Sequence, residues 1–157
     1  MADLKPPRLV GDERATLAAL LQYQRDSLVR KVAGVDEQAA RRPLVASGTT
    51  LVWLVKHLAQ AELRWVLVRF AGQAVELPDD TVGPDDTVAG VVAAYRAGWS
   101  RVDAVVAAAD LDEVCRDVGA DPPVNLRWVL AHLLEETARH AGHADILREL
   151  LDGRTGR

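Results

Sequence analysis

Four long segments of the sequence carry apolar residues at spacings of three, four and seven, and this periodicity constrains the fold more than any other feature. In the first segment, for example, Leu17, Leu21 and Leu28 fall on one helical face. No stretch shows the alternation of apolar and polar residues that is typical of a half-buried β-strand. The sequence therefore predicts an all-α protein, with helices over about residues 12–32, 51–71, 86–109 and 124–152.

Residues that cap helices stand at the expected ends of these segments. Asp12 is suited to accept a hydrogen bond at the start of the first helix, and Thr49 or Thr50 at the start of the second. Gly34 and Gly153 follow the ends of the first and last helices, where a glycine readily takes the left-handed conformation.

The links between the segments indicate how the helices are connected. Residues 36–42 are expected to form a short extra turn, and residues 110–123 a polar link. Residues 72–86 are rich in Gly, Pro and Asp, which makes this loop long for a helix bundle. A long crossover lets the helices before and after it run parallel. We predict a four-helix bundle with a long crossover between helices 2 and 3, in a single domain over 1–157 with an ordered core over about 11–153.

Composition excludes several other classes of protein. The chain has 157 residues, a net charge of −4 and a single cysteine. An acidic balance argues against nucleic-acid binding, and one cysteine excludes an intramolecular disulfide and a zinc ribbon. No apolar run is long enough to cross a membrane, and the first residues lack the apolar stretch of a signal peptide. We therefore expect a cytoplasmic protein with no nucleic-acid or membrane partner.

Histidine and glutamate side chains interrupt two of the apolar faces. His57 follows Leu54 by three residues, so it projects toward the same face. Glu136 and His140 are four residues apart and continue the face that begins at Leu126. Burial of an unpaired carboxylate is unfavourable by several kcal/mol, so Glu136 needs a partner.

A divalent metal ion would be such a partner. His57, Glu136 and His140 would supply two imidazoles and one carboxylate from two facing helices, which is typical of a catalytic zinc site with one open position. Nickel and iron suit the same ligand types. The alternative is a neutral buried His57 with Glu136 paired to an arginine, for which Arg64, Arg69 and Arg139 are the candidates.

Other chemically capable residues have simpler interpretations. His143, three residues after His140, is expected near the site as a fourth ligand, a donor to a ligand or a base, and His132 as a packing or rim residue. Cys115 lies in a predicted loop without a sequence sign of a histidine partner, so a catalytic thiol is disfavoured. The tryptophans are expected to pack in or at the edge of the core. Four aspartates of the long loop are expected to serve as turn and cap residues: Asp79, Asp80, Asp85 and Asp86.

Two segments resemble a known family. Residues 51–65, LVWLVKHLAQAELRW, are similar to the second helix of DinB-like four-helix proteins, and residues 125–153 to their last helix. More narrowly, the chain resembles an actinobacterial, uncharacterised subgroup of this superfamily, related to mycothiol-dependent maleylpyruvate isomerase and to bacillithiol and mycothiol S-transferases. The resemblance implies a four-helix bundle, often a homodimer.

The resemblance also implies a metal site and a chemistry. Many members have histidine at the position of Glu136, whereas the maleylpyruvate isomerase branch has a His, Glu, His set that His57, Glu136 and His140 match. The implied function is a metal-dependent S-transferase or isomerase that uses a low-molecular-weight thiol such as mycothiol on a small electrophile. Many members have glutamine at the position of His143, so the resemblance assigns this histidine no role; we expect it to act as a proton shuttle. A metal-dependent hydrolase and a non-enzymatic, metal-binding or stress-related bundle are the alternatives.

Overall fold

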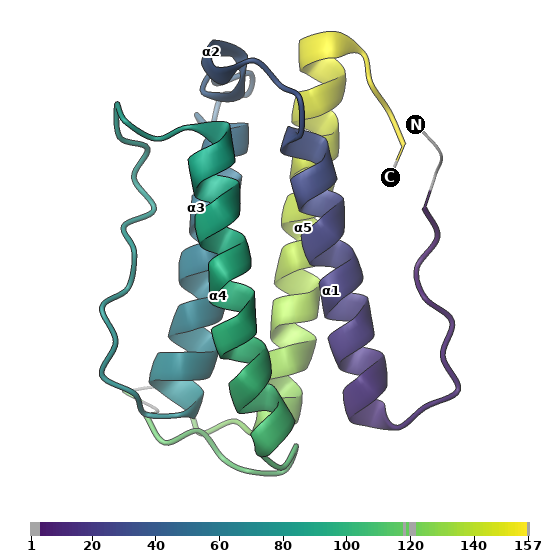
Figure 1. Ribbon diagram of the computed structural model, residues 1–157, viewed down its shortest axis with the longest axis vertical. Coiled ribbons are helices and arrows are strands. Elements are labelled where there is room, and N and C mark those ends of the chain that lie inside the picture. The colour runs from purple at the N-terminus through teal and green to yellow at the C-terminus, as the bar shows by residue number, and fades with distance from the viewer. Residues whose placement is uncertain (1–3, 118, 120–121, 157) are drawn as a thin grey trace.

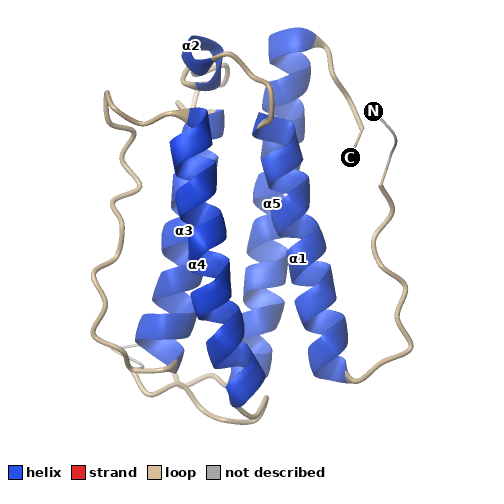
Figure 2. Ribbon diagram, in the orientation of Figure 1, coloured by secondary structure: helices blue, strands red, loops and turns tan. Residues whose placement is uncertain are grey.

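The computed structural model describes residues 4–117, 119 and 122–156, and these residues form helices and loops without a β-strand (Figures 1 and 2). An isolated bridge between Val114 and Asn125 is the one β-type pairing among them. The helical elements are α1 (Glu13–Val32), α2 (Glu37–Ala40), α3 (Leu51–Leu63), the π-helix η1 (Arg64–Phe70), α4 (Val88–Ala108) and α5 (Leu126–Asp152). The all-α prediction is confirmed.

The long helices pack as a bundle in two parallel pairs. In Figure 1, α1 and α5 run upward, whereas α3 and α4 run downward. The long crossover connects the end of η1, which continues α3, to the start of α4. The helix α1 packs mainly against α5, and α3 mainly against α4. The predicted crossover, at residues 71–87, runs along the outside of the bundle from the end of η1 to the start of α4. No helix in the described ranges is long and apolar enough to span a membrane.

The predicted caps are present. Asp12 accepts a hydrogen bond from the Ala15 N–H at 2.7 Å, and Thr50 accepts one from the Trp53 N–H at 3.1 Å. Gly153 follows α5 with a φ of 72°, a left-handed conformation that favours glycine. The helix ends therefore follow from local sequence.

The second predicted helix differs from the structure in its last two turns. The periodicity predicts one helix to about residue 71, but α3 gives way at Arg64 to the π-helix η1. The Ala71 N–H bonds to the Val66 carbonyl, five residues back. This wider turn still buries Val66 and Phe70, and an apolar run does not reveal which hydrogen-bond spacing its backbone adopts.

A network of buried polar side chains joins α1, α3 and α4 in the interior of the bundle. The Arg25 guanidinium (α1) donates to Glu62 (α3) at 2.6 Å, and the Tyr95 hydroxyl (α4) donates to Glu62 at 2.7 Å. All three residues are 1% exposed. Arg25 also donates to the partly exposed Asp103 at 2.9 Å. The apolar periodicity did not predict this network, because these side chains occupy core positions as paired polar groups.

Removal of one partner from this network should destabilise the bundle. We expect Arg25→Met to lower the free energy of unfolding by about 3–5 kcal/mol, because Glu62 stays buried without a counter-charge. Urea denaturation measures the change. The triple variant Arg25→Met, Glu62→Leu, Tyr95→Phe should recover most of the loss. Arg127→Met removes two surface ion pairs, to Glu13 and Asp112, as a control and should hardly shift the urea midpoint. An equally small effect of Arg25→Met would contradict the prediction.

Candidate metal centre

Two helices bring the three predicted ligands together. His57 lies in the middle of α3, and Glu136 and His140 lie one turn apart on α5. The Nε2 atoms of His57 and His140 are 3.3 Å and 3.0 Å from Glu136 Oε1. One ligand atom from each residue lies within 4.8 Å of the others, so the three side chains could hold a metal ion.

Two of the three separations between these ligand atoms fit a first-row divalent ion. Two ligand atoms at about 2.0 Å from one tetrahedral ion lie about 3.3 Å apart, close to both nitrogen–oxygen distances observed here. The side chains of His57, Glu136 and His140 are 26%, 21% and 11% exposed, so the cluster is shielded but reachable. Neutral imidazoles and an ionised carboxylate are ligands for zinc, nickel and iron.

Electrostatics favour the protonation states that a metal site needs. Burial lowers the pKa of His140 although the Glu136 carboxylate raises it, so the imidazole is held neutral. Partial burial raises the pKa of Glu136, but hydrogen bonds and charge from His57 and His140 outweigh that effect and bring it below its usual value. Glu136 is therefore ionised at neutral pH.

A third element, the crossover loop, reaches the cluster through Asp80. Its Oδ2 lies 3.3 Å from Nδ1 of His57, on the opposite side of the imidazole from Glu136. The loop is held to α3 by Lys56, which donates to Asp86 at 2.7 Å, and by Gln60, which donates to the Pro78 carbonyl at 2.8 Å. With a metal ion between Nε2 and Glu136, a carboxylate at this position would accept the Nδ1–H of His57 and direct the Nε2 lone pair toward the metal.

The loop aspartates were predicted to be turn and cap residues, and this is right for Asp79 but not for Asp80. Asp79 accepts from the Thr81 N–H at 2.9 Å, as a turn residue does. Asp80 instead contacts His57. The sequence did contain an indication of this contact. The crossover must run back along the whole second helix, so residues near the middle of the crossover, such as Asp80, pass beside the middle of that helix.

Trp53 packs directly on the cluster. Its ring stacks on His57 with centroids 4.7 Å apart, and meets His140 edge to face at 6.2 Å. This tryptophan was expected to pack in or at the edge of the core, and it is half-buried. Its ring shields one face of the candidate ligands from water, which strengthens electrostatic interactions within the cluster.

The other two histidines differ in their distance from the cluster, as predicted. His143 lies beside the cluster, with its Nδ1 3.3 Å from Nδ1 of His140. His132 stacks on Trp128 at 5.0 Å and contacts Trp65, away from the three candidate ligands. His132 is thus a packing residue near the surface.

The arginines proposed as alternative partners of Glu136 make other contacts. Arg139 pairs with Glu135, and Arg64 donates to Gln60 at 3.0 Å. The Arg69 guanidinium lies 4.8 Å from the Trp65 ring centroid. In the described part of the chain, the hydrogen-bond partners of Glu136 are therefore the two histidines.

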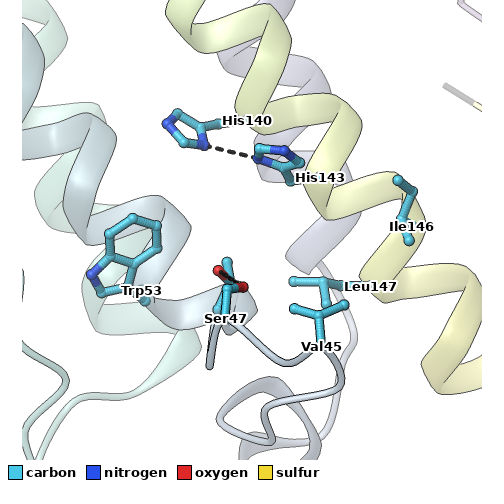
Figure 3. A pocket seen from close by; sticks show the side chains of 8 residues that line it. Val45, Ser47, Trp53, His140, His143, Ile146 and Leu147 are labelled. Atoms are coloured by element: carbon cyan, nitrogen blue, oxygen red, sulfur yellow. Dashed lines mark hydrogen bonds between the residues drawn. The ribbon is translucent and has the colours of Figure 1, made fainter.

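A pocket of about 440 Å³ adjoins the cluster (Figure 3). His140 and His143 lie at one end of it, Trp53 on one side, and Val45 and Leu147 opposite the histidines. Such a pocket is large enough to hold a small organic molecule.

Cys115 does not belong to this site. It lies among the apolar residues at the other end of the bundle, where it is 7% exposed. Burial raises the pKa of its thiol, so the nucleophilic thiolate is disfavoured. This agrees with the expectation that Cys115 is not catalytic.

Comparison with known proteins establishes the family. A family model described as mycothiol-S-transferase matches residues 16–153. The chain belongs to the mycothiol S-transferase family. This family is part of the DinB-like superfamily, which confirms the resemblance seen in the sequence.

One solved structure supports the family's fold in this chain. It is described as the conserved protein of locus from Enterococcus faecalis, and it is similar with a TM-score of 0.63 at 18% identity. The match covers 92% of this chain and 100% of that one, and at this identity it shows the fold alone. The curated proteins gave no match.

Proposed function

We propose that this protein is a metal-dependent S-transferase or isomerase that joins a low-molecular-weight thiol, mycothiol or a close relative, to a small electrophile. The observation that carries the proposal is the His57, Glu136, His140 cluster, whose ligand atoms lie within 4.8 Å of one another in a member of the mycothiol S-transferase family. We propose zinc as the metal, with nickel and iron as the other metals to test.

The chemistry follows from charge. A free thiol has a pKa of about 8.5 and is mostly protonated at neutral pH, and a divalent ion held here would lower that pKa. As metal ligands, both imidazoles would be neutral, and the ionised Glu136 would supply one negative charge. The protein ligands would therefore leave a net charge of about +1 on a divalent site, which favours an anionic thiolate over a neutral thiol.

Two neighbouring side chains would keep the ligands in this state. With a metal ion on Nε2 of both histidines, the Nδ1–H of His57 would donate to Asp80, whose Oδ2 lies 3.3 Å away. In the same way, the Nδ1–H of His140 would donate to Nδ1 of His143, also 3.3 Å away. His143 then carries its proton on Nε2, and we propose that this proton serves the reaction in the pocket that His143 lines.

Metal content is the first test. We expect protein purified without a metal-affinity tag to contain about one metal ion per chain by elemental analysis. Glu136→Gln should lose it, because the charged ligand is removed with little change of shape. Glu135→Gln is the matched control, since Glu135 is the adjacent, exposed residue on α5 and pairs with Arg139. A wild-type protein that binds no zinc, nickel or iron would overturn the enzymatic proposal.

Thiol ligation separates the S-transferase from a hydrolase. In cobalt-substituted protein, addition of mycothiol should produce the absorption band of a sulfur–cobalt bond, and Glu136→Gln should lack it. The S-conjugate of a small electrophile should then form faster than in the absence of protein. A metal-bound protein whose spectrum does not respond to the thiol favours activation of water instead.

Asp80 should tune the metal affinity of His57. We expect Asp80→Asn to weaken zinc binding roughly 10- to 100-fold, because an amide is a poorer acceptor for the His57 Nδ1–H than a carboxylate. Competition with a chromophoric chelator measures the affinity. Asp79→Asn is the control, since Asp79 caps a turn in the same loop and does not contact His57. Equal affinities for the two variants would contradict this role.

His143 should act in turnover rather than in metal retention. We expect His143→Ala to keep about one metal ion per chain when zinc is in excess, because the three candidate ligands remain. Its kcat should fall roughly 100-fold, the usual size of a positioned proton donor's contribution. Stopped-flow assays and elemental analysis of the same sample give both values. Loss of the metal with His143→Ala would show that His143 is a ligand.

Two further expectations stay predictions. These are the homodimer that the resemblance implies and the expected cytoplasmic location.

A further inference from the structure

We propose that the pocket beside the candidate ligands binds the electrophile and selects uncharged, apolar molecules over anionic ones. The pocket is the one lined by Val45, Ser47, Thr49, Trp53, His140, His143, Ile146 and Leu147. The assignment of its occupant as an electrophile rests on the function proposed above; the selection against charge rests on the lining itself.

The lining carries no lysine, arginine, aspartate or glutamate among these eight described residues. Ser47 and Thr49 supply hydroxyls at one edge, and these already bond to each other at 2.9 Å. An anionic group that entered would lose part of its hydration without gaining a cationic partner. A neutral apolar group would lose little and would cover apolar surface.

Two of the lining side chains are apolar and exposed, and they face the same pocket. Ile146 is 55% exposed and Val45 is 37% exposed, although both are large and apolar. They border the pocket from different elements, Ile146 from α5 and Val45 from the segment before α3 (Figure 3). An apolar ligand between them would remove both from water, which gives these positions a role in binding.

The pocket is continuous with the candidate metal ligands. The ring of His140 lies at its end, and Trp53, which forms its side, stacks on His57 at 4.7 Å. A molecule that fills the pocket therefore lies against the rings at the cluster, with its apolar remainder between Trp53 and Leu147. Glu136 and a bound thiolate together would balance the charge of a divalent ion, so no net positive charge would remain to attract an anion.

An alkylation reaction makes the selection measurable. With benzyl bromide, a sulfur lone pair of the thiolate forms the carbon–sulfur bond, the carbon–bromine bond breaks with its electrons on bromide, and the thiol proton passes to the buffer. The 4-(bromomethyl)benzoate anion has the same reacting carbon and leaving group but carries a carboxylate. After subtraction of the uncatalysed rates, we expect kcat/KM to favour benzyl bromide at least tenfold.

A binding experiment tests the pocket without any turnover. The unreactive pair is p-toluamide and p-toluate, added to zinc-loaded protein saturated with mycothiol so that the metal site carries no net charge. The readout is the Trp53 indole N–H signal in NMR titrations, assigned with Trp53→Phe. We expect p-toluamide to shift this signal and to bind at least tenfold more tightly than p-toluate. Equal affinities, or a preference for p-toluate, would overturn the proposal.

A single added charge should reverse the preference. Ile146→Lys places an ammonium at the exposed edge of the pocket, and we expect it to tighten p-toluate binding at least tenfold while weakening p-toluamide binding. Leu150→Lys is the matched control: Leu150 lies one turn further along α5, is also 55% exposed and does not line the pocket. Circular dichroism shows whether both variants are folded. An identical response of the two variants would contradict the proposal.

The two proposals can fail separately. Selective p-toluamide binding without thiol transfer supports the pocket and overturns the transferase function. Thiol transfer at equal rates to both bromides, with no selective binding, overturns the pocket's role and leaves the transferase function standing.

Discussion

The buried ion pair between Arg25 and Glu62 fixes the rotation of α3, and the geometry of the site depends on that rotation. Glu62 points from α3 toward α1 and α4, where Arg25 and Tyr95 bind its carboxylate. His57 precedes Glu62 by five residues, which places the two side chains about 140° apart around an α-helix. With Glu62 held on one side, His57 is directed to the other, where it meets Glu136 of α5. Apolar packing alone tolerates small rotations of a helix, whereas a fully buried ion pair has one acceptable geometry.

The crossover loop completes what the helices begin. In a bundle with short connections, the outer edge of His57 would face solvent, and its tautomer would be free. Here the loop returns along α3 and is held there by Lys56 and Gln60, so that Asp80 stands beside Nδ1 of His57. The topology that makes α3 and α4 parallel thus also supplies a carboxylate behind the imidazole. The long connection has a function in the site as well as in the fold.

The sequence predicted the parts of the site that depend on helical periodicity. His57, Glu136 and His140 were found because each lies on an apolar face, and a polar side chain at such a position needs a partner. The helix ends followed from local caps such as Asp12 and Thr50. Asp80 and Trp53 were not predicted as neighbours of the ligands, because their contacts join segments whose relative placement only the packed bundle sets. The change from α3 to η1 was also missed, because α- and π-turns bury the same run of apolar residues.

Polar and apolar parts of the site have opposite requirements, and the chain meets them at different positions along α5 and the segments beside it. The ligand cluster needs paired charges, so His57, Glu136 and His140 lie between α3 and α5, where Asp80 and His143 satisfy their remaining nitrogen atoms. The adjoining pocket needs surface without charges, and Ile146 and Val45 supply it at a cost in exposed apolar area. Ile146 and Val45 differ from other exposed apolar residues in that both face one pocket beside the candidate ligands. Binding of an apolar molecule there would turn their exposed methyl groups into buried contacts.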